Sequence, residues 1–408
     1  MSQHIDRRYF DVVHDRRHTG AVKYDTARLG GQVRSDLIPM WVADMEFQVP
    51  PEVEGALTAV ARHGIFGYSG TDESYDKALV NWFGRRLGWE ISSDWAIKAP
   101  GVMFGVSASL QTLSEVGDAV LICQPVYPPF ASVVLSNHRQ LVVSPLVFDG
   151  IRYEIDFPDF ERKVAEHRVK VFLMCSPHNP VSRVWRMDEL LEIGRICKKH
   201  GVYIISDDIH ADLVLAGHRH VPLASLSEDL ALRTVTCTSP SKTFNLSGLQ
   251  ACNIIAADPD IRYRLHKICL SLGYYNLNAM AIAATRTVYD EGEPWLETLL
   301  SYLEENAALL SEGLSDLGER IKLVRPEGTY LMWLDCRGLG LSEDALWRFF
   351  LDDVGLWLNR GDEFGAGGAG FMRMNIACPQ SVLLEAIGRL KCALSVFLWG
   401  SQLPHAPY

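Results

Sequence analysis

The sequence contains no apolar run that reaches the roughly 18 residues needed to cross a bilayer. Its first eight residues, Met-Ser-Gln-His-Ile-Asp-Arg-Arg, are polar and contain no apolar signal core. We therefore expect a cytoplasmic protein with no membrane partner.

Cysteine pairs with zinc-ligand spacing are absent, and so is the even-numbered framework typical of disulfide-stapled domains. The nine cysteines are scattered, mostly inside apolar runs such as those that end at Cys123 and Cys175. This distribution indicates reduced thiols within a core and a reducing compartment. We expect neither disulfides nor a bound metal.

An excess of positive charge is absent too, because 39 Lys and Arg stand against 50 Asp and Glu, for a net charge of -11. A nucleic-acid-binding surface needs clustered Lys and Arg, so we expect no nucleic-acid partner. The glycine-rich loop at 359–370 lacks the GxxxxGK(S/T) and GxGxxG spacings. We interpret this loop as a flexible turn and not as a nucleotide site.

Short β-rich runs alternate with amphipathic stretches in the middle of the chain. The β-rich runs lie at 119–123, 169–175, 202–206 and 234–237. Their continuous apolar character is typical of strands covered on both faces. Residues 186–200 have helical spacing and stop at Gly201. The pattern predicts an α/β fold with a mainly parallel, doubly wound sheet.

The last third of the chain mixes strand and helix more loosely. A long amphipathic helix is expected at 294–317, and β-prone segments lie at 328–335 and 371–377. These elements predict a second, smaller α+β lobe, and 408 residues exceed the size at which single cores usually stop growing. The expected domains are a large one at 51–285 and a small one formed by 1–50 and 286–408.

Lys242 is the only charged residue between Arg233 and Asp258. Burying an unpaired ammonium is costly, so such a lysine must lose its proton, find an anion or react covalently. All three outcomes suit a lysine that forms a Schiff base. The alternative is an exposed lysine on a polar loop.

Each predicted strand is followed by side chains that can do chemistry, namely Tyr127, Asn179, Asp207 with His210, and Lys242. Ligands of parallel sheets gather beyond the carboxyl ends of the strands, so we expect these side chains to share one rim. An electron-sink cofactor needs a lysine, a carboxylate for its ring nitrogen, an aromatic face and hydrogen-bond donors. The four strand ends supply that set.

An ordered series of motifs extends along nearly the whole chain. They are Lys23-Tyr-Asp25, 39–47, Phe66-Gly-Tyr68, Tyr127-Pro-Pro129, 176–180, 206–210, Ser239-Pro-Ser-Lys-Thr-Phe-Asn-Leu-Ser-Gly248 and 373–377. On these motifs the chain resembles the fold-type I pyridoxal-phosphate enzymes of the aminotransferase class I/II superfamily. Within it, the chain most resembles the MalY/PatB-like cystathionine β-lyase (C–S lyase) branch. The resemblance implies an aminotransferase-like fold and the cofactor pyridoxal 5'-phosphate.

The resemblance assigns roles around the cofactor ring. Lys242 forms the Schiff base and takes the Cα proton, and Asp207, in preference to its neighbour Asp208, pairs with the pyridine nitrogen. Asn179 and His210 bond the phenolic oxygen, and Tyr127 stacks on the ring.

Further roles concern the phosphate and the substrate. The expected phosphate ligands are the hydroxyls of Ser239 and Ser241 and the backbone amides of Val102 and Met103, at the start of a helix. Tyr68, also assigned to catalysis, reaches the phosphate across a subunit boundary, which implies a homodimer with shared active sites. Many class I/II enzymes carry an arginine where this chain has Gln250. Arg373 binds the substrate α-carboxylate, and Asn179 and Trp41 complete the expected substrate contacts.

Plain structural roles stay open for the same side chains when each is taken alone. Asp207 also suits a helix N-cap, Asn179 an ordinary turn before Pro180, and Tyr127 a core position. His210 is equally a structural histidine, and Arg373 a surface arginine on a strand.

The resemblance implies a carbon–sulfur β-lyase that cleaves L-cystathionine or related S-substituted L-cysteines to pyruvate, ammonia and a thiol. His210 favours this branch, because classical aminotransferases carry a tyrosine at that position. The alternatives are a class I/II aminotransferase on the same scaffold and a regulatory protein that retains the fold.

Overall fold

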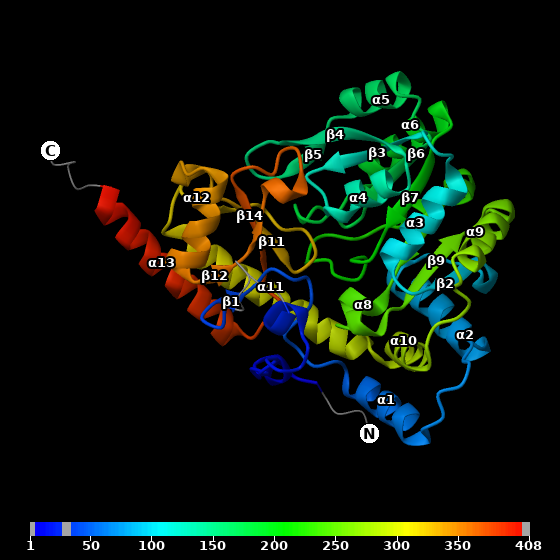
Figure 1. Ribbon diagram of the computed structural model, residues 1–408, viewed down its shortest axis with the longest axis horizontal. Helices are drawn as coiled ribbons and strands as arrows, with labels where there is room; N and C mark the ends of the chain where they lie inside the picture. The colour runs from blue at the N-terminus through cyan, green and yellow to red at the C-terminus, as the bar shows by residue number, and fades with distance from the viewer. Residues whose placement is uncertain (1–4, 27–33, 402–408) are drawn as a thin grey trace.

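An eight-stranded sheet forms the centre of the large lobe (Figure 1). The computed structural model describes residues 5–26 and 34–401. The strand order is β2 (Ala96–Ala99), β9 (Cys252–Ala256), β8 (Thr234–Thr238), β7 (Tyr203–Asp207), β6 (Val171–Cys175), β3 (Ala119–Gln124), β4 (Gln140–Phe148) and β5 (Tyr153–Ile155). β8, β7, β6, β3 and β4 run parallel, and β9 is antiparallel to both of its neighbours. The four predicted strands are confirmed.

Both faces of this sheet are buried, which explains the continuous apolar runs of its strands. Val120 and Ile122 pack into one core layer, and Leu121 and Cys123 pack into the layer on the opposite face. The first layer contains α3 (Val102–Leu113), α4 (Pro129–Ser136) and α9 (Pro259–Ser271), and the second contains α5 (Phe157–Glu166), α6 (Met187–His200) and α7 (Glu228–Arg233). The doubly wound α/β architecture expected from the sequence is therefore confirmed.

The helix expected at 186–200 is α6, and it ends where its sequence indicates. Gly201 adopts a left-handed conformation at φ 67° and donates its backbone N–H to Cys197 O. Glycine adopts this conformation without the steric cost of a Cβ, so it is the usual residue after a helix. The stop places β7 and its carboxyl-terminal Asp207 directly after the crossover.

The small lobe has an antiparallel sheet in the order β10 (Lys322–Leu323), β11 (Leu331–Asp335), β14 (Phe371–Asn375) and β13 (Asn359–Arg360). A second pair joins β1 (Ile38–Pro39) in parallel with β12 (Leu356–Trp357). Its helices are α11 (Glu293–Ser315), α12 (Glu343–Arg348) and α13 (Gln380–Ser401). The long helix and both strands predicted in this region are confirmed, with shorter strands than the sequence indicated.

The glycine-rich loop at 359–370 packs against the small-lobe sheet, and its expected flexibility stays a prediction. It begins as strand β13, and Phe364 within it is buried against Trp333, with ring centroids 5.4 Å apart. A Cβ added at Gly361 would lie 2.1 Å from Gly368 O. The glycines therefore permit a close backbone approach that any side chain would prevent.

The largest apolar core continues from the small lobe into the large one. It includes Leu310 of α11, Trp82 of α2 (Glu73–Trp82) and Phe244, which follows the short helix α8 (Pro240–Thr243). α1 (Pro51–His63) and α2 pack against α10 (Ala279–Glu291), which leads into α11 (Figure 1). The division into domains at 51–285 and at 1–50 with 286–408 stays a prediction.

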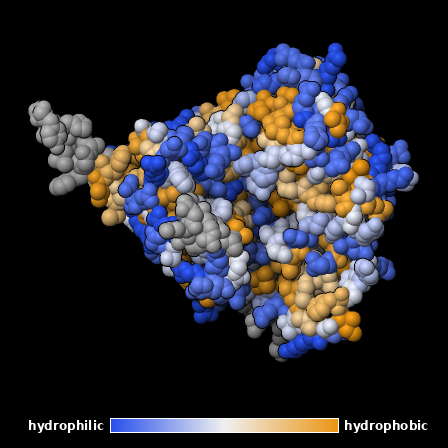
Figure 2. Space-filling model, in the orientation of Figure 1, coloured by the Kyte–Doolittle hydropathy of each residue, from blue (hydrophilic) through white to orange (hydrophobic). Residues whose placement is uncertain are grey.

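The space-filling view shows the surface hollowed between the two lobes (Figure 2). Among the described residues, no helix combines the length and the apolar character needed to span a membrane.

Candidate active site

A cavity of about 190 Å³ lies at the carboxyl ends of β6, β7 and β8, beside the N-terminus of α3. Its lining includes Val102, Met103, Tyr127, Asn179, Asp207, His210, Ser239, Ser241 and Lys242. Nine of the predicted site residues thus meet at one rim of the sheet, where parallel strands place their ligands. Trp41, Tyr68 and Arg373 do not line this cavity.

Lys242 is presented by α8, a single helical turn after β8. Ser239 caps this turn, because its hydroxyl accepts the backbone N–H of Ser241 at 3.0 Å. Lys242 Nζ donates hydrogen bonds to Ala43 O at 2.6 Å and to Ser247 Oγ at 3.3 Å. Burial lowers the pKa of Lys242 to about 8, although Asp44 opposes this shift. About a tenth of the amine is therefore unprotonated at pH 7, and this is the form that a nucleophile or base requires.

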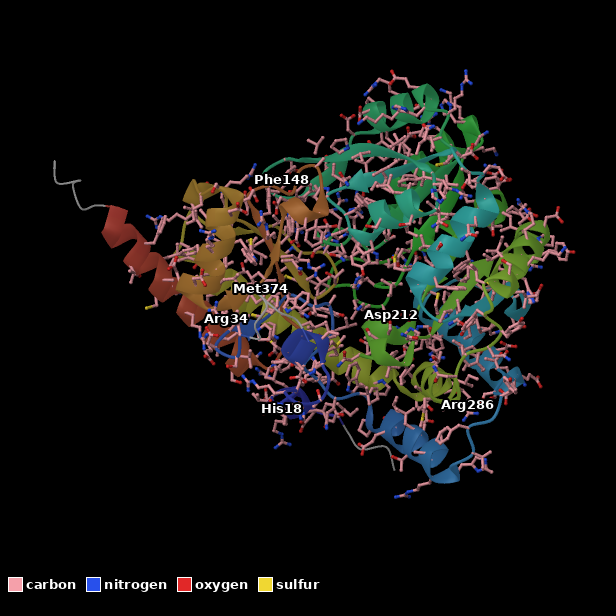
Figure 3. All side chains as sticks on the ribbon, in the orientation of Figure 1. His18, Arg34, Phe148, Asp212, Arg286 and Met374 are labelled. Carbon is pink, nitrogen blue, oxygen red and sulfur yellow. The ribbon has the colours of Figure 1, made fainter. Side chains whose placement is uncertain are left out.

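Asp212, which the sequence reasoning did not identify, supports this turn. Asp212 Oδ2 accepts the Thr243 hydroxyl at 2.9 Å, and its Oδ1 accepts Trp82 Nε1–H at 3.2 Å. Figure 3 shows Asp212 close to α8. Burial raises the pKa of Asp212. The signal available in the sequence was the carboxylate five residues after Asp207, in the same polar segment.

Asp207 and Asp208 point to different surroundings. Asp207 lines the cavity and is buried, and its Oδ1 accepts the backbone N–H of Ile209 at 3.1 Å. Asp208 instead contacts His220 Nε2 at 3.0 Å and accepts the Ser206 hydroxyl. Burial, with a smaller contribution from Asp208, raises the pKa of Asp207 to about 7. A cationic ring nitrogen beside Asp207 would relieve that cost.

His210 presents an unsatisfied polar atom in the cavity wall. The side chain is buried, and within the described residues its Nδ1 has no hydrogen-bond partner. Burial lowers the pKa of His210 to about 3, so the imidazole is neutral at physiological pH. A buried polar nitrogen without a partner is rare and suits a bound ligand that carries a polar oxygen.

Tyr127 and Asn179 are joined through the backbone. Tyr127 N–H donates to Asn179 O at 3.1 Å, and both side chains line the cavity. Burial raises the pKa of Tyr127, which keeps its phenol neutral. The two residues bring the loops after β3 and β6 together.

Arg373, on β14 of the small lobe, reaches this rim through Asn179. Its Nη1 donates to Asn179 Oδ1 at 3.0 Å, and its Nη2 donates to Asn359 Oδ1 at 2.6 Å and to Trp41 O at 2.8 Å. Burial lowers its pKa to about 10, so the guanidinium stays charged near neutrality. Its buried Nε has no partner among the described residues, which leaves a donor available for an anion.

Trp41 stacks on Trp357 with ring centroids 4.8 Å apart and an interplanar angle of 14°. Its buried Nε1 also lacks a hydrogen-bond partner among the described residues. Trp41 therefore lies beside Arg373 at the small-lobe side of the site and not in the cavity wall.

The candidate phosphate ligands surround one end of the cavity. Ser239 Oγ donates to Ala251 O at 2.5 Å, and the hydroxyl of Ser241 lies in the lining. Val102 and Met103 occupy the first turn of α3, where backbone N–H groups have no partner within the helix. Gln250, at the position where many class I/II enzymes carry arginine, also lines the cavity.

Tyr68 lies on the surface between α1 and α2, and its side chain is fully exposed. It borders a groove formed by 66–69 and 273–280. Within a single chain, Tyr68 is therefore not brought to the cavity.

Comparison with known proteins identifies the family of this chain. Residues 35–390 match the family "Aminotransferase class I and II", and the chain belongs to it. Cystathionine beta-lyase PatB of Bacillus subtilis is 41% identical over 390 residues, covering 95% of this chain and 100% of that protein.

Two solved structures extend the comparison. Cystalysin of Treponema denticola, which contains pyridoxal 5'-phosphate, superposes with a TM-score of 0.92 at 35% identity, covering 95% of this chain and 99% of that one. A pyridoxal-phosphate-bound protein of Clostridium difficile, provisionally named an aminotransferase, superposes with a TM-score of 0.91 at 40% identity, covering 94% and 99%. The family and fold expected from the motifs are confirmed.

Proposed function

We propose that the protein is a pyridoxal-phosphate-dependent carbon–sulfur β-lyase that cleaves L-cystathionine or related S-substituted L-cysteines. The observation that carries this proposal is the meeting of Lys242, Asp207 and His210 in one buried cavity. The full-length similarity to cystathionine beta-lyase PatB supports the choice of reaction. The products would be pyruvate, ammonia and a thiol.

The side chains around the cavity fit the cofactor. Asp207 would hold the protonated ring nitrogen, which accounts for a buried carboxylate that has no cation in hydrogen-bond contact within residues 5–26 and 34–401. His210 Nδ1 and Asn179 would bond the phenolic oxygen, and Tyr127 would cover the ring face. When bound, pyridoxal phosphate supplies an electron sink for negative charge developing at the substrate Cα.

The phosphate would lie at the N-terminus of α3. The amides of Val102 and Met103 and the hydroxyl of Ser241 would bond its oxygens. The Ser239 hydroxyl would join them by turning away from Ala251 O, to which it donates in this structure. Because Gln250 replaces an arginine, these neutral donors would carry more of the binding than in many class I/II enzymes.

Lys242 would move the proton. Its amine lies in the cavity with a pKa of about 8, so it can accept the Cα proton near neutral pH. Ala43 O and Ser247 Oγ hold this amine when it is free. These two hydrogen bonds would keep the base in place while the carbon–sulfur bond at Cβ breaks.

Arg373 would bind the substrate α-carboxylate through its unpartnered Nε and the edge of its guanidinium. Asn179, which is already bonded to Arg373, would contact the same carboxylate, and Trp41 would border the substrate. These contacts would orient the Cα–H bond toward Lys242.

The active enzyme would be a cytoplasmic homodimer with shared active sites. The exposure of Tyr68, beside a surface groove, supports this assembly, because a partner subunit could take up that tyrosine at its own phosphate site. Large exposed aromatics grouped on one surface are typical of interfaces.

An aminotransferase is the second candidate, favoured by the name of the Clostridium difficile relative. Incubation with L-cystathionine in the absence of any keto acid separates the two activities. We expect pyruvate and free thiol in equal amounts over many turnovers. One turnover that ends with an aminated cofactor and no thiol would instead identify an aminotransferase.

A further inference from the structure

Residues 41–45 form a strap whose backbone carbonyls are all bonded by side chains. The donors are Arg373 to Trp41 O (2.8 Å), Asn375 to Val42 O (2.6 Å) and Asp44 O (2.7 Å), Tyr330 to Ala43 O (3.0 Å), and Asn245 to Met45 O (3.0 Å). Ala43 O also accepts the hydrogen bond from Lys242 Nζ. The strap thus fixes an oxygen that touches the proposed catalytic amine.

A buried ionic cluster is attached to this strap through Asp44 and Glu46. Lys23 is 2% exposed, and its Nζ lies 2.6 Å from Glu46 Oε1, 2.9 Å from Asp44 Oδ1 and 3.1 Å from Asp44 O. Arg16 Nη2 donates to Asp44 Oδ2 at 2.7 Å, and the Tyr24 hydroxyl donates to Glu46 Oε2 at 2.9 Å. We call these five residues the Lys23 cluster.

The charges of the Lys23 cluster balance, since Lys23 and Arg16 face Asp44 and Glu46. Burial alone would raise the pKa of Asp44, but Lys23 and Arg16 outweigh it and hold that pKa below its ordinary value. Removal of one partner from such a buried group leaves an uncompensated charge. That charge would then act on the groups beside the strap, including the amine of Lys242.

The cluster gives a role to the motif Lys23-Tyr-Asp25, which the proposed reaction does not use. Lys23 and Tyr24 both bind Glu46. The carboxylate of Asp25 accepts three backbone N–H groups, from His18 at 2.9 Å, Thr19 at 2.9 Å and Gly20 at 2.8 Å. The motif therefore folds its own turn and attaches it to the strap.

Lys242 is within the electrostatic reach of this cluster. The charged groups that act on it are Asp44, Arg373, Asp207 and Lys23, and neutral His210 lines the same cavity. Asp44 favours the protonated amine, and Lys23 opposes it. Lys23 thus offsets the effect of Asp44, the carboxylate that it contacts, on the pKa of Lys242.

We propose that Lys23 is a positioning residue for Lys242: it holds the strap so that Ala43 O faces the free amine, and its charge balances that of Asp44. This inference rests on the proposed function, because it concerns the lysine to which that function assigns the proton transfer. Lys23 itself does not line the cavity.

The test measures how readily Lys242 is arylated by trinitrobenzenesulfonate as pH is varied. The full-length chain, freed of cofactor, is labelled, and modification of Lys242 is followed by mass spectrometry. Lys23→Met and Asp44→Asn change the net charge of the Lys23 cluster in opposite directions, and Lys23→Arg keeps the positive charge at position 23. Lys163→Met is the matched control, because Lys163 Nζ also bonds a carbonyl, Val143 O at 2.7 Å, and a carboxylate, Asp159 at 2.7 Å.

We expect the arylation midpoint to fall by about one pH unit in Asp44→Asn and to rise by a smaller amount in Lys23→Met, because Asp44 acts on Lys242 more strongly than Lys23 does. Lys23→Arg and Lys163→Met should keep the wild-type midpoint. An unmoved midpoint in Lys23→Met, or the same displacement in Lys163→Met, overturns the proposal. If Lys23→Met does not fold, Asp44→Asn provides the test. An arylation midpoint that stays unchanged or rises in Asp44→Asn also overturns the proposal.

Turnover gives the second readout in the enzyme loaded with pyridoxal phosphate. We expect kcat for L-cystathionine to fall about tenfold in Lys23→Met, with KM changed by no more than about twofold, because a displaced base slows proton transfer and leaves binding intact. A tenfold change confined to KM contradicts the proposal. A wild-type protein that releases no thiol while the arylation midpoints still move would disprove the lyase and leave this inference standing.

Discussion

Arg373 Nη1 lies 3.0 Å from Asn179 Oδ1, so a strand of the small lobe is hydrogen bonded to the loop that follows β6 in the large lobe. In the proposed enzyme Arg373 contacts the substrate carboxylate and Asn179 contacts the cofactor. A change at Arg373 should therefore alter both substrate binding and the cofactor environment.

Arg373→Lys tests this coupling. The ammonium retains the charge but cannot reproduce the fork that bonds Asn179 and a carboxylate together. We expect kcat/KM for L-cystathionine to fall about 100-fold, with most of the loss in KM. Arg337→Lys is the control, since Arg337 pairs with Asp335 and does not line the cavity. Equal kinetics for Arg373→Lys and wild type would exclude a role in carboxylate binding.

Lys242→Ala tests the covalent attachment of the cofactor. Without the amine, pyridoxal phosphate can bind only through non-covalent contacts, so the visible absorbance band should disappear after dialysis against a competing amine. Lyase turnover should fall by at least about 1000-fold, because nucleophile and base are removed together. Lys267→Ala is the control, because Lys267 lies beside the Tyr263 ring, and it should retain both the absorbance band and lyase turnover. A persistent band in Lys242→Ala would assign the attachment to another residue.

Asp207→Asn should stabilise the cofactor-free protein at alkaline pH while abolishing catalysis. The folded pKa of Asp207 is about 7, above its value in an unfolded chain, so its contribution to stability is complete below about pH 4 and is lost as pH rises through 7. Relative to wild type, we expect a gain of about 2–4 kcal/mol in the free energy of unfolding at pH 8 and almost none at pH 4.

Urea unfolding at the two pH values measures this difference. Asp208→Asn is the control, because it weakens the contact with His220 and should give no gain at pH 8. Loss of stability in Asp207→Asn at pH 8 would show that Asp207 has a cation partner in the cofactor-free state.

Mixing two inactive variants tests the shared active site. In heterodimers of Lys242→Ala with Tyr68→Ala, one site carries both changes and the other carries neither. We expect activity to recover toward about half of the wild-type value per heterodimer. A mixture of Lys242→Ala with Asp207→Ala should recover none, since both residues belong to the same chain's cavity. Failure of the first mixture, with subunit exchange verified, would place Tyr68 outside the partner's site.

The central sheet and its rim could be predicted because the information is local. Continuous apolar runs give the strands, Gly201 gives a helix stop, and parallel topology sends every strand end to one edge. Lys242, Asp207 and Tyr127 follow strands directly, so predicting the strands was enough to group them. Arg373 was predicted only by resemblance, because nothing local distinguishes it from an arginine on a surface strand.

The Lys23 cluster and Asp212 could not be predicted from local pattern. Lys23 and Glu46 are distant in sequence, and their pairing depends on how the N-terminal segment crosses the strap. Asp212 bonds Thr243 and Trp82 from two other elements. Contacts of this kind arise from tertiary packing between distant segments. They leave no regular residue spacing from which they could be predicted.

The burial of the cysteine side chains determines which of them the thiol product of the proposed reaction would modify after oxidation. Of its nine cysteines, eight are buried and only Cys392, on α13, is exposed. Cys175 lines the cavity, but burial raises its pKa well above the ordinary value, and a protonated thiol is a poor nucleophile toward disulfides. Released thiols that oxidise in air would therefore form mixed disulfides at Cys392 first, leaving the catalytic chamber unmodified during storage.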